Sequence, residues 1–98
     1  MLQIWQINGD VPGAEDLLFE SFSRLEKMGR KPEKKNYKCV FSEENEQNLS
    51  LESVFERFNI CIPEGYTGHS LSVSDVIEKN GRFFFVDSFG FVEITAYF

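Results

Sequence analysis

Residues 71–87 read LSVSDVIEKNGRFFFVD, and this stretch decides the fold because it holds two apolar runs separated by Asn80-Gly81. Asn-Gly is the strongest short signal for a tight β-hairpin, since both residues accept the positive φ angles that the turn requires. The stretch therefore predicts two antiparallel strands, one over 71–77 and one over 82–87.

Three further segments outside the hairpin read as strands. Residues 91–97 follow a turn at 88–90, and residues 37–41 alternate between polar and apolar side chains with a period of two. Residues 2–7 are rich in β-branched and aromatic side chains with apolar groups on both faces, which is typical of an inner strand. The polar stretch 43–48 is expected to be an acidic loop.

A first helix of about 15 residues is expected after Pro12-Gly13. Leu18, Phe22 and Leu25 stand at i, i+4 and i+7, which places them on one apolar stripe. Acidic residues come first and basic residues last, as suits the helix dipole, and Gly29 is a good residue to end the helix.

A second, shorter helix is expected after Ser50, whose side chain can cap it. Its apolar face has helical spacing and is formed by Leu51, Val54, Phe55 and Phe58. Asn59 is expected to take the left-handed conformation at its end, before Pro63 prevents continuation.

The order β-α-β-α-β-β-β predicts an α+β fold, a mainly antiparallel sheet with two helices on one face. Ninety-eight residues are enough for one compact domain, and we expect a single domain over 1–98. The longest uninterrupted apolar run is far shorter than the roughly 20 residues that a membrane helix needs, so we expect no membrane association. No secretory signal is visible at the N-terminus, which favours a cytoplasmic protein.

The net charge of −6 is unevenly divided along the chain. Residues 24–38 hold seven basic residues against two glutamates, a net charge of +5, whereas the remainder holds three basic residues against 14 acidic ones, a net charge of −11. The overall acidity argues against direct binding to nucleic acid. It also raises the alternative that the acidic part imitates a nucleic-acid backbone toward a basic partner.

Metal or cofactor binding is not indicated by the metal-ligating residues. Cys39 and Cys61 are 22 positions apart without a Cys-x-x-Cys pair, and the single histidine, His69, does not complete a tetrahedral zinc site with them. We therefore expect no metal and no cofactor, and two cysteines that behave as small buried hydrophobes.

The candidate catalytic groups lie around residue 75. If 71–77 is a strand, Ser70, Ser72 and Ser74 share one face, and Asp75 falls on the apolar face. A buried carboxylate there needs hydrogen-bond donors, an outward bulge or a raised pKa. A Ser-His-Asp hydrolase can be drawn from these serines with His69, but no G-x-S-x-G motif supports it, so we expect no catalytic site.

Fifteen aromatic residues, eleven of them phenylalanine, are many for so small a sheet. Most are expected in the core. The aromatic residues that could instead form an exposed patch for a protein partner are Trp5, Phe89, Phe91, Tyr97 and Phe98.

Several of these motifs resemble the YodL-like domain family. The resemblance is carried by 51–59 (LESVFERFN), Pro63, 68–77 (GHSLSVSDVI) and 86–91 (VDSFGF), and it runs from about Tyr37 to the C-terminus with weaker agreement at 2–7. It implies a small bacterial domain that also occurs in phage and mobile-element proteins, with no established catalytic reaction.

The resemblance favours a cytoplasmic protein-interaction domain that binds and modulates another, unidentified protein. Two alternatives stay open: an acidic inhibitor of a restriction or CRISPR nuclease, and a small hydrolase. We expect binding on the loop 66–70 and the turn 87–90, because loops presented by a rigid sheet commonly bind partners. The candidate binding residues are Tyr66, His69, Ser70, Ser72, Ser74, Asp75, Asp87, Ser88, Phe89 and Gly90.

Overall fold

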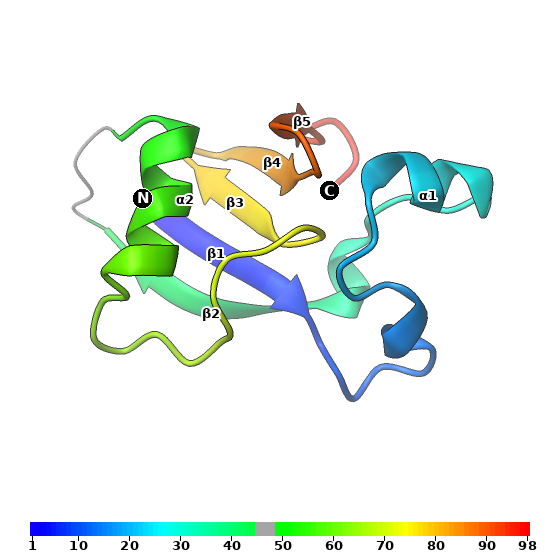
Figure 1. Cartoon of the computed structure of the whole chain (residues 1–98), viewed down its shortest axis with the longest axis horizontal. Helices are drawn as coiled ribbons and strands as arrows, with labels where there is room; N and C mark the ends of the chain where they lie inside the picture. Colours follow the sequence, from blue (N-terminus) through cyan, green and yellow to red (C-terminus); the bar gives the residue numbers. More distant parts are fainter. Residues whose placement is uncertain (45–48) are drawn as a thin grey trace.

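The computed structural model of the protein describes residues 1–44 and 49–98 and shows a sheet with helices packed beside it (Figure 1). Most of the acidic loop expected at 43–48 lies outside the described residues. The elements in chain order are β1 (Leu2–Ile7), a 3₁₀ turn (Ala14–Asp16), α1 (Phe22–Lys27), a 3₁₀ turn (Lys34–Asn36), β2 (Tyr37–Glu43), α2 (Leu51–Ile60), β3 (Val76–Lys79), β4 (Arg82–Val86) and β5 (Phe91–Glu93). This confirms the predicted α+β class and the order of its strands and helices.

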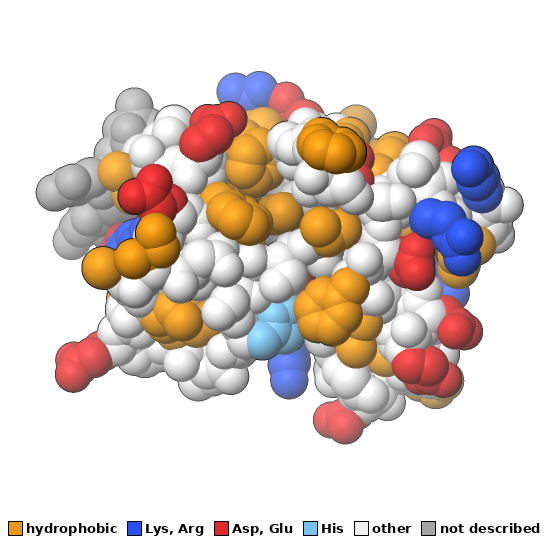
Figure 2. All heavy atoms as spheres, in the orientation of Figure 1, with side chains coloured by type: hydrophobic (Ala, Val, Ile, Leu, Met, Phe, Trp, Pro, Cys, Tyr) orange, Lys and Arg blue, Asp and Glu red, His pale blue; other side chains and the backbone are white. Residues whose placement is uncertain are grey.

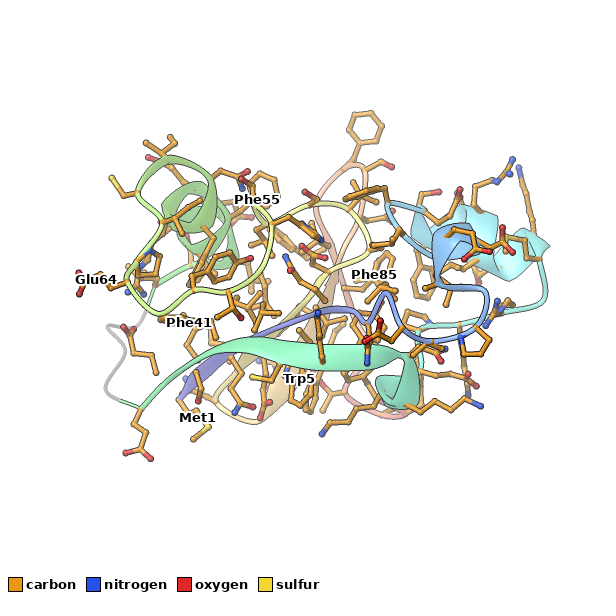
Figure 3. The ribbon with its side chains drawn as sticks, turned by 90° about the horizontal axis from the view of Figure 1, so that it is seen from below. Met1, Trp5, Phe41, Phe55, Glu64 and Phe85 are labelled. Carbon is orange, nitrogen blue, oxygen red and sulfur yellow. The ribbon has the colours of Figure 1, made fainter. Side chains whose placement is uncertain are left out.

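Within the described residues, five strands form one antiparallel sheet in the order β2-β1-β3-β4-β5. β1 lies between β2 and β3, as its apolar residues on both faces predicted. α2 crosses one end of the sheet and α1 lies beside the other end (Figure 1). Seen from below, both helices lie above β2, and Phe41, Phe55 and Phe85 are on that side of the strand (Figure 3).

The predicted hairpin at Asn80-Gly81 is confirmed. Lys79 pairs with Arg82 across a two-residue loop. Asn80 and Gly81 have φ angles of 52° and 80°, the positive values that a type I′ turn requires. The turn therefore matches the right-handed twist of the two strands that it joins.

The predicted strand over 71–77 is wrong in its first five residues. The N–H of Asp75 donates to the carbonyl of Ser72 at 3.1 Å and Ser74 has a φ of 84°, so the chain turns here. Ser74 N–H donates to the Val86 carbonyl and Val86 N–H donates to the Asp75 carbonyl, which fastens this turn to the end of β4. The strand alternation that would put the serines on one face is therefore absent.

The predicted first helix is also wrong in length. Only a 3₁₀ turn forms at Ala14–Asp16, and Phe19 then interrupts the helical path with a φ of 61°. α1 begins after Ser21, whose Oγ accepts the N–H of Arg24 at 3.3 Å. It ends as predicted at Gly29, which has a φ of 72°.

α2 begins as the sequence predicts, because Ser50 Oγ accepts the N–H of Ser53 at 3.1 Å. The left-handed conformation expected for Asn59 is wrong, and Asn59 stays within the helix. Its side-chain amide donates to the carbonyls of Phe55 and Leu71 at 2.8 and 3.0 Å. Asn59 therefore ties α2 to the segment that leads into the 71–75 turn.

The hydrophobic core consists of two clusters that share the central strands. The first is formed by Leu2, Ile4, Val40, Val54, Phe58, Leu71, Ile77 and Val86. The second is formed by Ile7, Ala14, Leu17, Leu25, Tyr37, Val76, Phe85 and Ile94. Since β1, β3 and β4 supply residues to both clusters, the packing of α2 and the packing of α1 depend on the same strands.

Two smaller expectations are corrected by the structure. The last strand covers only Phe91–Glu93, and the chain turns after it instead of continuing to residue 97. Cys39 and Cys61 are both exposed rather than buried, because one is on the edge strand β2 and the other follows the last turn of α2. None of the described helices is long and apolar enough to cross a membrane.

Candidate functional site

Asp75 is the central residue of the candidate site. Its side chain is 0 % exposed, and its Oδ2 accepts the N–H of Ser72 at 2.8 Å and the side-chain amide of Gln6 at 3.0 Å. Its Oδ1 is buried without a hydrogen-bond partner and lies 3.9 Å from Nε2 of His69. Burial raises the pKa of Asp75 to about 7, although the hydrogen bonds and His69 oppose this shift.

Gln6 organises the groups around Asp75. Its amide nitrogen lies within 3.2 Å of three acceptor atoms, namely Tyr66 Oη, the His69 carbonyl and Asp75 Oδ2, and also 3.2 Å from His69 Nδ1. An amide has only two hydrogens to donate, so these acceptors compete for them. Gly68 passes so close that a Cβ there would be 2.0 Å from Gln6 Oε1, and therefore any larger residue would displace the Gln6 side chain.

His69 links this buried network to the surface. Its Nδ1 lies 2.7 Å from the Ser70 carbonyl, which can only accept, so Nδ1 carries the hydrogen of a neutral ring and Nε2 faces Asp75. The ring is 39 % exposed and packs against Phe19 at 5.4 Å between centroids. Nε2 of His69 and Oδ1 of Asp75 therefore face each other at 3.9 Å, beyond the distance of a direct hydrogen bond.

The serine side chains turn toward the backbone. Ser72 Oγ donates to the Ser70 carbonyl at 2.8 Å, and Ser74 Oγ accepts the N–H of Phe19 at 3.0 Å. Tyr37 Oη donates to the Ser74 carbonyl at 2.6 Å. These contacts hold the 71–75 turn in place.

Asp87 has a comparable positioning role in the second predicted loop. Its Oδ1 accepts the N–H of Phe22 at 3.1 Å and the N–H of Ser88 at 2.8 Å, and its own N–H donates to the Gly90 carbonyl. The turn 87–90 is thus fastened to the start of α1. Phe89 at its tip is 98 % exposed.

The segment 19–22 joins the two predicted loops into one surface. Ser74 holds the backbone of Phe19, and Asp87 holds the backbone of Phe22. Phe19 is 59 % exposed, and its ring covers part of His69. Figure 2 shows the single histidine in the middle of this face with hydrophobic side chains beside it and above it.

Gln6 and Phe19 belong to this site but were not among its predicted residues. Gln6 follows the buried Leu2 by four residues and the buried Ile4 by two, so all three share one face of β1. A polar side chain at such a core position is the sequence signal that could have identified Gln6. Phe19 gave no such signal, because its apolar side chain suited the expected helix.

A groove lies next to the turn 87–90. Its volume is about 280 Å³, and its lining consists of Glu52, Phe55, Val86, Asp87, Ser88, Gly90 and Phe91. A second groove of about 310 Å³ lies elsewhere along α2, lined by Leu49, Ser53, Glu56, Arg57, Ile60 and Cys61. Among the described residues, no cluster of three His, Cys, Asp or Glu side chains could hold a metal ion.

Other predicted aromatic residues face a different part of the molecule. Lys34 Nζ lies 4.9 Å from the centre of the Trp5 ring and 5.1 Å from that of Phe83, and Lys31 lies over Tyr97. Basic residues of the +5 segment thus cover these rings, and Phe89 is the member of the predicted patch that stands free in solvent.

On the face shown in Figure 2, the described acidic residues are dispersed rather than aligned. Glu43 pairs with Arg57 at 2.9 Å, and Glu93 pairs with Arg82 at 2.7 Å. On the face in Figure 2, the described Asp and Glu side chains are spread around the rim with basic and apolar groups among them. This arrangement gives no support to an acidic imitation of a nucleic-acid backbone.

These features define a small α+β domain in which a network of polar side chains positions loops and exposes aromatic rings between them. The model of the YodL-like domain family matches residues 1–97, and the chain belongs to this family. The match includes the first third of the chain, where the sequence resemblance was weakest. No curated protein and no solved structure matches the chain.

Proposed function

We propose that this domain binds another protein through the surface formed by Phe19, His69 and Phe89. The observation that carries the proposal is that hydrogen bonds from Ser74 and Asp87 to the backbone position two segments whose phenylalanine rings, Phe19 and Phe89, are exposed to solvent. Large apolar groups that a structure fixes in solvent are typical of contact surfaces for protein partners.

The backbone of Phe19 strengthens this argument. A φ of 61° at a residue other than glycine costs about 1–3 kcal/mol, and such strain concentrates at functional positions. Ser74, which holds the Phe19 N–H, is itself in the left-handed region with a φ of 84°. Two strained residues therefore cooperate to present one exposed ring.

The proposal gives the polar groups of the site no catalytic role. Asp75 and Asp87 accept hydrogen bonds from the chain itself, and the serines contact backbone groups. We place the interaction in the bacterial cytoplasm, with a partner encoded by the host or by a mobile element, as the family resemblance leads us to expect.

Affinity capture from a bacterial host, followed by quantitative mass spectrometry, tests this proposal. Phe89→Ser should lose the partner that the unmodified domain captures, by at least about tenfold, because truncating an aromatic hot-spot residue commonly costs about 2 kcal/mol or more and tenfold corresponds to about 1.4 kcal/mol. The matched control is Ile62→Ser, which removes an exposed apolar side chain from another loop. Equal capture by both variants, with purified components as well as in lysate, would contradict the proposed surface.

A further inference from the structure

The groove beside the turn 87–90 has a chemistry that the exposed rings alone do not explain. Its floor is apolar, since Phe55, Val86 and Phe91 line it, and Glu52 and Asp87 add two carboxylates. Among its described lining residues, none is basic. The groove is therefore an apolar slot with negative charge beside it.

The second groove on α2 provides a contrast within the same helix. There Glu56 lies beside Arg57, whose guanidinium makes a bidentate pair with Glu43 at 3.0 and 2.9 Å. A cation is thus already built into that groove. The groove of Glu52 and Asp87 has no such cation in its lining, so an occupant would have to supply one.

The size of the groove limits what can fill it. About 280 Å³ is at or below the lower end of the range for small-molecule sites, and it suits one or two side chains. Phosphates and other anions would meet two carboxylates there. Phe89 stands between Ser88 and Gly90, which line the groove, so its exposed ring can extend the contact beyond the slot.

We propose that this groove binds a short segment of a partner protein in which an aliphatic or aromatic side chain stands beside a lysine or arginine. The apolar side chain would pack on Phe55 and Phe91, and the basic group would lie near Glu52 and Asp87. This inference rests on the proposed function, because it names the part of the partner that the same surface takes.

Selection of binders from a library of random peptides, carried out on the full-length domain, tests this inference. Enriched peptides should combine an apolar residue with an adjacent lysine or arginine. Their affinity should fall by about tenfold or more with Phe55→Ala and with Glu52→Lys, as expected for contacts at the centre of an interface. Added salt should weaken binding to the unmodified domain and should have less effect on Glu52→Gln.

Glu56→Lys is the matched control, since it makes the same charge reversal one helical turn further along α2, at the other groove. It should reduce peptide affinity much less than Glu52→Lys, because Glu56 lines the other groove and only Glu52 lines the proposed contact. Circular dichroism of each variant checks that α2 is intact. Peptides without basic residues, or equal losses with Glu52→Lys and Glu56→Lys, would overturn the inference.

The same variants separate this inference from the proposed function. A captured partner that is lost with Phe89→Ser but kept with Glu52→Lys supports the protein-binding surface and overturns the groove as the basic-segment site. Concentration-dependent dimerisation that Glu52→Lys abolishes would show that the +5 segment of a second copy fills the groove, which overturns a foreign partner there.

Discussion

At the scale of single residues, Asp75 and Gln6 decide how the interior responds to pH. A carboxyl group that is fully buried with one unpartnered oxygen is held more easily in its neutral form. Gln6 cannot compensate fully, because its two amide hydrogens are shared among three acceptors. The ionised form of Asp75 is therefore unfavourable in the folded domain.

This leads to a prediction for the pH dependence of stability. The pKa of Asp75 is raised from its ordinary value near 4 to about 7, so the folded state retains a proton that the unfolded chain has released over that range. The contribution of this group to the free energy of unfolding is present below about pH 4 and is lost as the pH rises to about 7. Tyr37 and Tyr66 also face Asp75, and their own raised pKa values keep both neutral throughout this range.

Asp75→Asn should remove this fall of the free energy of unfolding with rising pH. It should also stabilise the domain at about pH 8, by up to a few kcal/mol. The asparagine oxygen can accept from Ser72 and Gln6, and its amide can donate toward Nε2 of His69. Urea denaturation at a series of pH values measures the effect, with the exposed Asp16→Asn as the control. An unchanged slope in Asp75→Asn would show that ionisation of Asp75 does not cause it.

At the scale of elements, local signals predicted those parts of the fold that local interactions stabilise. Asn80-Gly81 marks its own turn, and Ser50 caps α2 through Ser53, only three residues away. The break at Phe19 could not be predicted in this way. Its N–H is bound by Ser74, which is 55 residues away in the chain, and this tertiary contact overrides helical periodicity.

The candidate site likewise combines features that the local sequence predicted with features that depend on distant residues. The structure buries Asp75 as alternation predicted, but through the turn at 71–75 rather than on a strand face. Alternation also predicted that the carboxylate would need donors, an outward bulge or a raised pKa, and the structure has the donors and the raised pKa. It could not identify Gln6 as a donor, because Gln6 and Asp75 are 69 residues apart and meet only across β1 and β3. The predicted surface lacked Phe19 for the same reason.

The segment 19–22 should therefore depend on acceptors from the far end of the chain. Ser74→Ala removes the acceptor of the Phe19 N–H, and amide exchange at Phe19 should accelerate by an amount equivalent to about 0.5–1.5 kcal/mol. Asp87→Ala should do the same at Phe22 by about 1.5–3 kcal/mol, because its acceptor is charged. Hydrogen exchange followed by NMR measures both.

Ser72→Ala is the control for these variants, since its hydroxyl donates to the Ser70 carbonyl instead of accepting from segment 19–22. It should leave the amides of Phe19 and Phe22 protected. If all three variants accelerate exchange equally at both amides, the two side chains do not hold the segment individually, and its order comes from apolar packing.

At the scale of the whole molecule, both edges of the sheet are poorly suited to pairing with another strand. β5 has only three residues, and the pairing of β1 with β2 shifts register between Ile4 and Trp5, opposite Val40. The Val40 carbonyl also accepts from the backbone N–H and the hydroxyl of Thr67. A partner is therefore expected on the loop surface rather than as an added strand.

The arrangement of the two core clusters predicts that the domain unfolds cooperatively. Because neighbouring residues such as Val76 and Ile77 belong to different clusters, loss of either cluster disturbs β3. Leu25→Ala in the second cluster should cost about 2–5 kcal/mol, and Phe58→Ala in the first about 3–5 kcal/mol. Each variant should lower the midpoint of one common unfolding transition, as in other small single domains.

Two probes distinguish a common transition from separate ones. Trp5, the single tryptophan, packs against the second cluster, whereas α2, the longest described helix, contributes strongly to the far-ultraviolet circular dichroism and packs on the first. Thermal melts of Leu25→Ala followed by Trp5 fluorescence and by circular dichroism should coincide. An earlier fluorescence transition, with α2 still folded, would mean that the α1 end unfolds alone, and the rings of Phe19 and Phe89 would then rest on a less stable support than the sheet.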